Sequence, residues 1–521
     1  QKAKRWRAHE PMQQFSIRTK CTTPDEFPQH KTRPCTPTAA SRASLIHSFI
    51  KIITKTLALR LAPRMNELVS PCQSAFIQKR SIHENFLAVR SAVRRFQRIN
   101  SPTLFLKLDI EKAFDSVRWD YLIALLRNLG FPVRWTDWIA SILSTSTSRV
   151  LVNGVPNPPI HHERGLRQGD PLSPLLFVLA IDPLQKILKI AADSGALSKL
   201  GNSSPSIRIS LYADDAALFV KPKKEDIETI VKLLTSFGEA SGLMTNFQKS
   251  MIVPIRCQGL PLDDILSCFP ARRATFPIRY LGLPLSTTRL RKEHFQFLVD
   301  KVLNKLSSWN GRNFSVAGRL NLVKTVLTSQ PIYLLTALNA PKATISLLDS
   351  KRRQFLWAGS ERLTGGKCKV NWKRVARPKS LGGLGVLDLG AFARALRARW
   401  LWHNCTSSQN IWDNLEIPCS DVDRLLFAAS TTIDIGDGSK ISFWGNAWVR
   451  GQRPKDLAPR LFSISRNKRK SLAEAVTNNA WIMDLALFDR SITPHHIHEF
   501  CILWSEVQKI QFHPERDDAI T

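Results

Sequence analysis

The sequence lacks the features of a disulfide-bonded or membrane-spanning protein. Its nine cysteines are an odd number within 521 residues, and no two of them form a Cys-x-x-Cys pair. This usage is typical of a chain that folds in a reducing compartment. The longest clean apolar run, Leu172–Ile181, ends at Asp182-Pro183 and is too short to cross a bilayer. We therefore expect no membrane-spanning segment.

Acidic residues are scarce compared with basic ones. The chain has 75 Lys and Arg against 42 Asp and Glu, which gives a formal net charge of +33. The basic residues extend over the whole length, so the excess is not confined to one tail. A basic surface of this size attracts nucleic acid or an anionic membrane. Without a spanning segment, nucleic acid is the expected partner.

An initiating methionine and a recognisable targeting segment are also missing. The first residue is Gln1, and residues 1–43 are basic, rich in Pro, Thr and Gln, and without a sustained apolar period. We interpret residues 1–43 as a degenerate or disordered leader and the chain as a piece of a longer reading frame. The predicted location is nuclear or cytoplasmic.

Two adjacent carboxylates, Asp214 and Asp215, stand between the apolar runs 207–211 and 216–220. This pattern predicts a β-hairpin that holds both acids at its turn. Two other Asp-Asp pairs, at 263–264 and 517–518, are interpreted as a solvated loop and a tail. The pair at 214–215 differs because its apolar frame has no structural need for two charges. It is the leading candidate for a functional site.

A third carboxylate, Asp109, follows a short apolar strand predicted over 104–108. A carboxylate at the end of a strand is a common position for a catalytic group. The same residue would equally serve as the cap of the following turn. The sequence that follows Asp109 predicts a helix that ends at Gly130.

A glycine-rich basic loop, residues 164–174, precedes a strong helix start. Gly165 and Gly169 would let a ligand approach the backbone closely, and Gln168 offers both a donor and an acceptor. Ser173 is the expected N-cap, with Pro174 in the first helical position. The composition also fits a generic anion-binding turn, so the loop alone does not decide its ligand.

Two basic helices are predicted before the first acid, one from Ser44 to about Pro63 and one over about 83–98. Singly, the arginines of the second helix fit a solvated charged face. Taken together, they suit a surface that follows phosphates. These arginines are Arg90, Arg94, Arg95 and Arg98.

Taken in order, the three stretches resemble motifs A, B and C of reverse transcriptases: Asp109–Phe114, Arg164–Pro174 and Tyr212–Asp215. The segments 242–250 and 279–285 resemble motif D and the primer grip. Further similarity lies in thumb and C-terminal segments, at 309–312, 317–320, 370–372, 382–385 and 443–448. Over about residues 44–480, the chain is identified as a member of the LINE-type (non-LTR) retrotransposon reverse transcriptases, of the kind abundant in plants and truncated at both ends.

The resemblance implies an α+β right-hand polymerase fold. A palm with an antiparallel sheet is joined to fingers, a helical thumb and a mainly helical C-terminal region. The implied boundaries are 1–43 for the leader, 44–100 for the fingers, 101–286 for the palm, 287–345 for the thumb and 346–521 for the C-terminal region. The sequence indicates no role for the last of these.

The family's activity is RNA-directed DNA polymerisation, which needs an RNA template, a DNA primer and dNTPs. Two Mg²⁺ ions about 3.5–4 Å apart would serve both ends of the in-line displacement, and Mn²⁺ is the substitute ion. Such hard cations require clustered carboxylates. By resemblance, Asp109 and Asp214 bridge the ions and Asp215 is a more peripheral third acid. The carbonyl of Ile110 would complete one coordination shell.

The same resemblance assigns residues to the substrates. Phe114 would be the steric gate that collides with a ribose 2′-hydroxyl, and the alternative is a core phenylalanine. Lys249 would face the triphosphate. Three residues would line the nascent base pair and template, namely Gln168, Gly169 and Ser173. The expected primer grip is formed by Tyr280, Leu281 and Gly282.

One segment departs from the family pattern. The family has an Arg-Pro pair that contacts the triphosphate, whereas this chain has Ser41-Arg42-Ala43 at that place, and Arg33-Pro34 lies too far upstream. An alternative is therefore a catalytically dead nucleic-acid-binding retrotransposon fragment. Its RNA-binding residues would include Arg394, Arg397 and Arg399. A second alternative, an RNA-dependent RNA polymerase, is disfavoured by Phe114 and Ala213.

Overall fold

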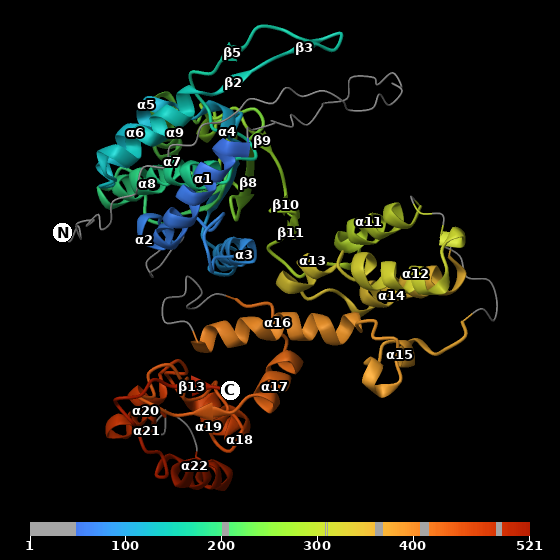
Figure 1. Ribbon diagram of the computed structural model, residues 1–521. Helices are drawn as coiled ribbons and strands as arrows, with labels where there is room; N and C mark the ends of the chain where they lie inside the picture. Colours follow the sequence, from blue (N-terminus) through green and yellow to red (C-terminus); the bar gives the residue numbers. More distant parts are fainter. Residues whose placement is uncertain are drawn as a thin grey trace. The chain divides into compact units, whose positions relative to one another are not determined.

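The computed structural model describes residues 48–200, 208–307, 309, 311–359, 368–406, 416–485 and 492–521 (Figure 1). They fall into two compact units. The first comprises the described residues up to Ser81 and those within Pro102–Ala274, and the second comprises Ile82–Ser101 and the described residues within Thr275–Thr521. The predicted leader lies outside the described residues. The predicted finger, palm and thumb boundaries stay predictions.

A five-stranded sheet forms the centre of the first unit, in the order β6-β7-β1-β8-β9. Its middle strand β1 (Thr103–Leu108) is antiparallel to β7 (Asp215–Val220) on one side and to β8 (Met251–Ile255) on the other. The edge strands are β6 (Ile209–Tyr212), antiparallel to β7, and β9 (Arg272–Arg273), parallel to β8. The strand predicted over 104–108 and the hairpin predicted at Asp214-Asp215 are confirmed.

The middle strand is mostly apolar because both faces of the sheet are covered. Leu104, Phe105 and Leu106 are fully buried, and the ring centroid of Phe105 lies 5.4 Å from that of Phe219 on β7. The helix α7 is apolar all round for the same reason: each of its residues except Pro174 is buried.

The helices of the first unit pack beside this sheet (Figure 1). Their bounds are α1 (Ser48–Leu61), α2 (Met65–Leu68), α4 (Ala113–Ser116), α5 (Trp119–Asn128), α6 (Val133–Ser144), α7 (Ser173–Ile181), α8 (Pro183–Asp193), α9 (Lys224–Ser241) and α10 (Leu262–Ile265). The strands of a separate exposed hairpin are β2 (Thr147–Ser148), β3 (Leu151–Val152), β4 (Val155–Pro156) and β5 (Ile160–His161). Within its unit, this hairpin extends away from the helices in Figure 1.

The second unit is mainly helical. Its first elements are α3 (Ile82–Arg98), the hairpin β10 (Ile278–Tyr280) and β11 (Leu283–Leu285), α11 (Gln296–Ser307), α12 (Val316–Leu322), α13 (Ile332–Ala337), α14 (Lys342–Ala358), α15 (Trp372–Val375), α16 (Leu389–Thr406) and α17 (Asp421–Ser430). They are followed by β12 (Ile433–Asp434), α18 (Pro454–Leu457), α19 (Pro459–Ile464), α20 (Leu472–Val476), α21 (Ala480–Met483), α22 (Pro494–Val507) and β13 (Ala519–Ile520). Across the described ranges, no helix is long and apolar enough to span a membrane.

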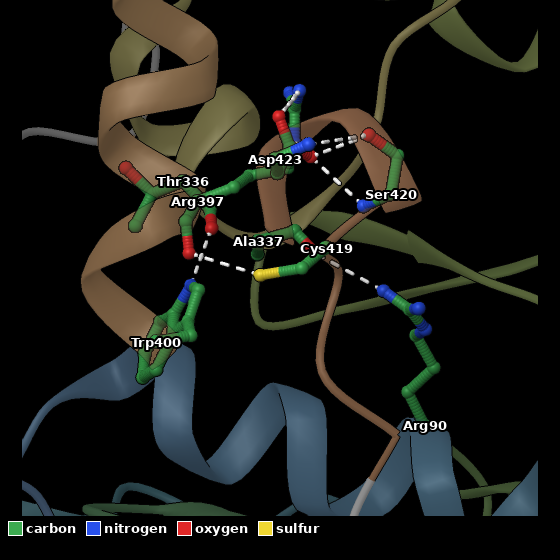
Figure 2. A network of polar contacts seen from close by, with 8 residues as sticks. All are labelled: Arg90, Thr336, Ala337, Arg397, Trp400, Cys419, Ser420 and Asp423. Atoms are coloured by element: carbon green, nitrogen blue, oxygen red, sulfur yellow. Dashed lines mark hydrogen bonds and ion pairs between the residues drawn. The ribbon is translucent and has the colours of Figure 1, made fainter. Parts of the chain in front are cut away.

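A buried ion pair joins α16 to α17 in the second unit (Figure 2). The Arg397 guanidinium donates two hydrogen bonds of 2.9 Å to the Asp423 carboxylate, which also accepts from the backbone and hydroxyl of Ser420. Both charged side chains are almost fully buried. The prediction that Arg397 contacts RNA is therefore wrong, because its charge is neutralised inside the unit.

The arginines of α3 also have partners within the second unit. Arg90 is buried and donates to the carbonyl of Ala337 on α13 at 3.0 Å (Figure 2). Arg94 donates to the Glu416 carboxylate at 2.6 Å. The prediction that α3 presents a row of phosphate-binding arginines is wrong for Arg90, which fixes one helix to another.

Candidate active site

Strand register brings the three predicted acids to one end of the sheet. Leu108 pairs with Ala216, so the next position in the same register places Asp109 opposite Asp215. Tyr212 pairs with Asp215 across the hairpin, which leaves a turn of only two residues, Ala213 and Asp214. Asp109 and Asp214 are exposed, and Asp215 is half-buried. Asp109 lies just beyond β1, and the other two acids are at the tip of its neighbouring hairpin.

The pKa of Asp215 responds to its burial and to the charges around it. Burial raises the pKa of Asp215, the nearby ammonium of Lys107 lowers it, and the negative charges of Asp214 and Asp109 raise it further. The Lys107 Nζ lies 3.6 Å from the Asp215 Oδ1. A divalent cation would relieve this repulsion, since it favours the ionised form of every carboxylate near it.

The donor chemistry of this end of the sheet fits a hard divalent cation, because all candidate ligands are oxygens. In the part of the chain that the structure describes, no three acidic, histidine or cysteine side chains are placed so that together they could hold a metal ion. Asp215 is instead paired with Lys107. Ile110, whose carbonyl is the fourth candidate ligand, is buried and forms a β-bridge with Thr245.

The backbone on both sides of the site is held by side chains from distant segments. The Asp109 N–H donates to the Ser250 hydroxyl at 3.1 Å. The Ala213 N–H donates to the Gln73 side-chain carbonyl, also at 3.1 Å. We did not predict these two contacts, and no local sequence signal indicates them.

The glycine-rich loop before α7 is organised by Asp170. Its buried carboxylate accepts hydrogen bonds from the backbone N–H groups of Leu172 and Ser173 and from the Ser173 hydroxyl, at 3.1–3.2 Å. Ser173 is the first residue of α7 and donates to Asp170. The expected N-cap role of Ser173 is therefore wrong. Asp170 accepts the free N–H groups of the first turn, which an acceptor-only carboxylate does well.

The rest of the loop is more open. Gln168 is exposed and its side-chain amide donates to the Asp115 carboxylate at 3.1 Å. Gly169 has φ +83° and empty space where a side chain would begin. Phe114 is partly buried and stacks on Phe177 of α7, with ring centroids 4.5 Å apart and an interplanar angle of 15°. Both roles of Phe114, as a steric gate against the ribose 2′-hydroxyl and as a core phenylalanine, stay predictions.

Lys249 and the predicted primer grip lie in different units. Lys249 is exposed in the loop before β8, where its backbone N–H donates to the Asn246 side chain. The residues Tyr280–Gly282 belong to the β10–β11 hairpin of the second unit. In that hairpin Leu281 and Gly282 have φ of +46° and +75°, and the Tyr333 hydroxyl donates to the Leu281 carbonyl at 2.5 Å.

Part of the sequence matches a known family. Residues 36–285 match the family described as Reverse transcriptase (RNA-dependent DNA polymerase). This chain carries a reverse transcriptase domain. The identification confirms the resemblance drawn from its motifs, and the antiparallel sheet with its helices confirms the α+β class of a polymerase fold.

Relatives of the domain occur in non-LTR retrotransposons. The chain is 30% identical over 363 residues to "Transposon TX1 uncharacterized 149 kDa protein" of Xenopus laevis, across 68% of this chain and 26% of that protein. It is 25% identical over 374 residues to "Retrovirus-related Pol polyprotein from type-2 retrotransposable element R2DM" of Drosophila melanogaster, across 69% of this chain and 34% of that protein. The chain thus spans about a quarter to a third of the length of these relatives.

Solved telomerase structures also match. One is "Structure of telomerase from Candida albicans in complexe with TWJ fragment of telomeric RNA", at 12% identity and a TM-score of 0.33, across 67% of this chain and 56% of that one.

Proposed function

We propose that this reverse transcriptase domain extends a DNA primer on an RNA template with dNTPs. The observation that supports the proposal best is the register of β1 and β7, which sets Asp109 opposite Asp215 beside the Asp214 turn. Structural need does not explain three mutually repelling carboxylates at the end of one sheet. Phosphoryl transfer by bound metal ions does need them.

In this proposal Asp109 and Asp214 hold two Mg²⁺ ions, or Mn²⁺ in their place, with Asp215 as the third acid and the Ile110 carbonyl as a further ligand. The ions would activate the primer 3′ oxygen and neutralise the pyrophosphate leaving group. The ammonium of Lys107, 3.6 Å from the Asp215 carboxylate, neutralises part of its charge.

The remaining predicted residues would position the substrates. Phe114 is the proposed gate against ribonucleotides, and Lys249 the proposed triphosphate contact. Three residues of the glycine-rich loop would face the nascent base pair and template, namely Gln168, Gly169 and Ser173. The primer would lie on Tyr280, Leu281 and Gly282. Ser173 would act through its backbone, because its side-chain hydroxyl already donates a hydrogen bond to Asp170.

Template-dependent synthesis by the purified chain tests this proposal. A DNA primer annealed to RNA should be extended with dNTPs and much less with ribonucleotides. Equal use of ribonucleotides would favour an RNA polymerase. Binding of the primer–template without any extension would favour the alternative, a catalytically dead nucleic-acid-binding fragment. An Asp214→Asn variant serves as the baseline for extension.

A further inference from the structure

A buried glutamine lies next to the turn that carries Asp214. Gln73 is fully buried, and its segment runs beside the edge strand β6. The Leu211 N–H donates to the Cys72 carbonyl at 2.9 Å, and the Ser74 N–H donates to the Leu211 carbonyl at 3.3 Å. This short stretch therefore pairs with β6 and extends the central sheet by one more strand-like segment at the edge next to the hairpin.

The Gln73 side chain accepts two backbone hydrogen bonds. Its Oε1 receives the N–H of Ala75 at 3.0 Å and the N–H of Ala213 at 3.1 Å. Its Nε2 is buried and has no hydrogen-bond partner among the described residues. Two N–H donors facing the same atom fix the orientation of the amide, since the reversed orientation would set a donor against two donors. The oxygen of Gln73 is thus the part that holds the turn.

The turn needs an acceptor at this place. Ala213 has φ +52°, a left-handed conformation that a residue with a Cβ adopts only when its surroundings enforce it. Ala213 is also buried, so water does not serve its N–H. Without Gln73 the backbone could leave this conformation and carry Asp214 with it.

A matching contact exists on the other side of the site. Ser250 is buried, accepts the N–H of Asp109 at 3.1 Å and donates to the Asn246 carbonyl at 2.7 Å. The Asn246 N–H in turn donates to the Asp109 carbonyl at 2.8 Å. Ser250 thus fixes the backbone of Asp109, and Gln73 fixes the backbone of Ala213, the residue directly before Asp214.

We infer that Gln73 and Ser250 are positioning residues, which set the separation of Asp109 and Asp214 for cation binding by holding the backbone at each acid. This inference rests on the proposed function. In this inference neither residue contacts a substrate or an ion. Each acts through a main-chain hydrogen bond, and groups that orient metal-binding carboxylates typically change metal affinity about 10–100-fold when removed.

Two matched pairs of variants separate positioning from packing. Gln73→Met keeps the length of the side chain and removes the acceptor, whereas Gln73→Glu keeps an oxygen for both N–H donors. Ser250→Ala removes the hydroxyl and Ser250→Thr retains it. Thermal unfolding and anisotropy of a labelled primer–template report whether each full-length variant is folded.

Mn²⁺ binding to the full chain, measured by titration with electron paramagnetic resonance, is the direct readout. We expect Gln73→Met and Ser250→Ala to weaken Mn²⁺ affinity at least about tenfold, with Gln73→Glu and Ser250→Thr close to wild type. Primer extension should show the same order in the Mg²⁺ concentration that gives half-maximal rate. If the two residues had a purely structural role, the variants would unfold at a lower temperature, but their Mn²⁺ affinities would not follow this order.

The outcomes distinguish this inference from the proposed function. If the wild type binds Mn²⁺ no better than Asp214→Asn, the proposed function fails. If the wild type binds better than Asp214→Asn but folded Gln73→Met and Ser250→Ala bind like the wild type, the positioning inference is overturned and the proposed function stands. Should Gln73→Met not fold, the Ser250 pair decides in the same way.

Discussion

Lys107 and Asp215 form an ion pair between adjacent strands β1 and β7, with 3.6 Å between the Lys107 Nζ and the Asp215 Oδ1. The pair lies at the end of the sheet where the other two acids stand. Burial raises the pKa of Asp215, and the lysine partly offsets that effect. Lys107 therefore favours the ionised form of Asp215 against the effect of burial.

Replacing Lys107 should move the pH dependence of activity. Lys107→Met removes the positive charge, so the pKa of Asp215 rises further above its usual value. Activity needs the ionised acid and is lost as the pH falls through this pKa, so the acidic limb of the pH–rate profile should shift to higher pH. Lys232→Met, at an exposed position on α9, is the matched control and should leave the profile unchanged. An unshifted limb in Lys107→Met would contradict the role of the pair.

Breaking the Arg397–Asp423 pair should destabilise the second unit strongly. Asp423→Asn leaves a buried guanidinium uncompensated, which typically costs about 3–5 kcal/mol. Chemical denaturation measures this loss. Arg516 and Asp434 form an exposed pair in the same unit, and Asp434→Asn should cost no more than about 1 kcal/mol. Equal losses in the two variants would contradict the account.

The same buried pair predicts a loss of stability in acid. Burial alone would raise the pKa of Asp423, but hydrogen bonds from Arg397 and Ser420 outweigh it, so the net pKa is below the usual value. Its contribution is therefore present above the usual pKa of an aspartate and is lost as the pH falls through the lowered one. Asp423→Asn should flatten this part of the stability–pH curve, and a curve like that of the wild type would contradict the assignment.

Gly242 and Gly130 offer a test of close backbone packing near the site. Both have positive φ, of +84° and +85°, after α9 and α5 respectively. A Cβ at Gly242 would lie 2.0 Å from the carbonyl oxygen of Ser116 on α4, whereas a Cβ at Gly130 meets nothing within 4 Å. Gly242→Ala should thus cost about 1–3 kcal/mol more than Gly130→Ala in denaturant unfolding. A loss of unfolding free energy in Gly242→Ala no larger than that in Gly130→Ala would show that α4 moves aside at little cost.

Phe114 should decide sugar selectivity if it is the gate. Phe114→Ala is expected to reduce the preference for dNTPs over ribonucleotides at least about tenfold, measured as the ratio of kcat/KM values. Phe177→Leu removes its stacking partner and leaves Phe114 in place, so it should lower stability and keep selectivity. A Phe114→Ala variant that loses stability but keeps selectivity would make Phe114 a core residue.

The end of the sheet that carries the three acids could be predicted because its signals are local. The apolar strand before Asp109 and the two runs around Asp214-Asp215 each carry their own pattern, and the structure places them side by side. The contacts of Gln73 and Ser250 could not be predicted. Each reaches a backbone N–H 140 or 141 residues away, and such a contact leaves no periodic signal in the sequence.

The burial of Arg90 and Arg397 could not be predicted for a related reason. In sequence, Arg90 and Arg397 look like other basic residues on helices, and an exposed phosphate-binding surface is the simplest interpretation of such a series. Arg90 donates to the carbonyl of Ala337, and Arg397 is neutralised by Asp423. Only tertiary packing brings these partners near. A count of positive charges therefore overstates the surface left for nucleic acid.

The central claim is that Asp109 and Asp214, with Asp215, form the metal site of a polymerase. The most direct test is primer extension on an RNA template by the wild type, Asp109→Asn, Asp214→Asn and Asp263→Asn, the last from an exposed Asp-Asp pair on α10. We predict Mg²⁺-dependent extension by the wild type and Asp263→Asn, and loss of at least about a thousandfold in rate for the other two. Extension by Asp214→Asn at the wild-type rate would contradict the claim.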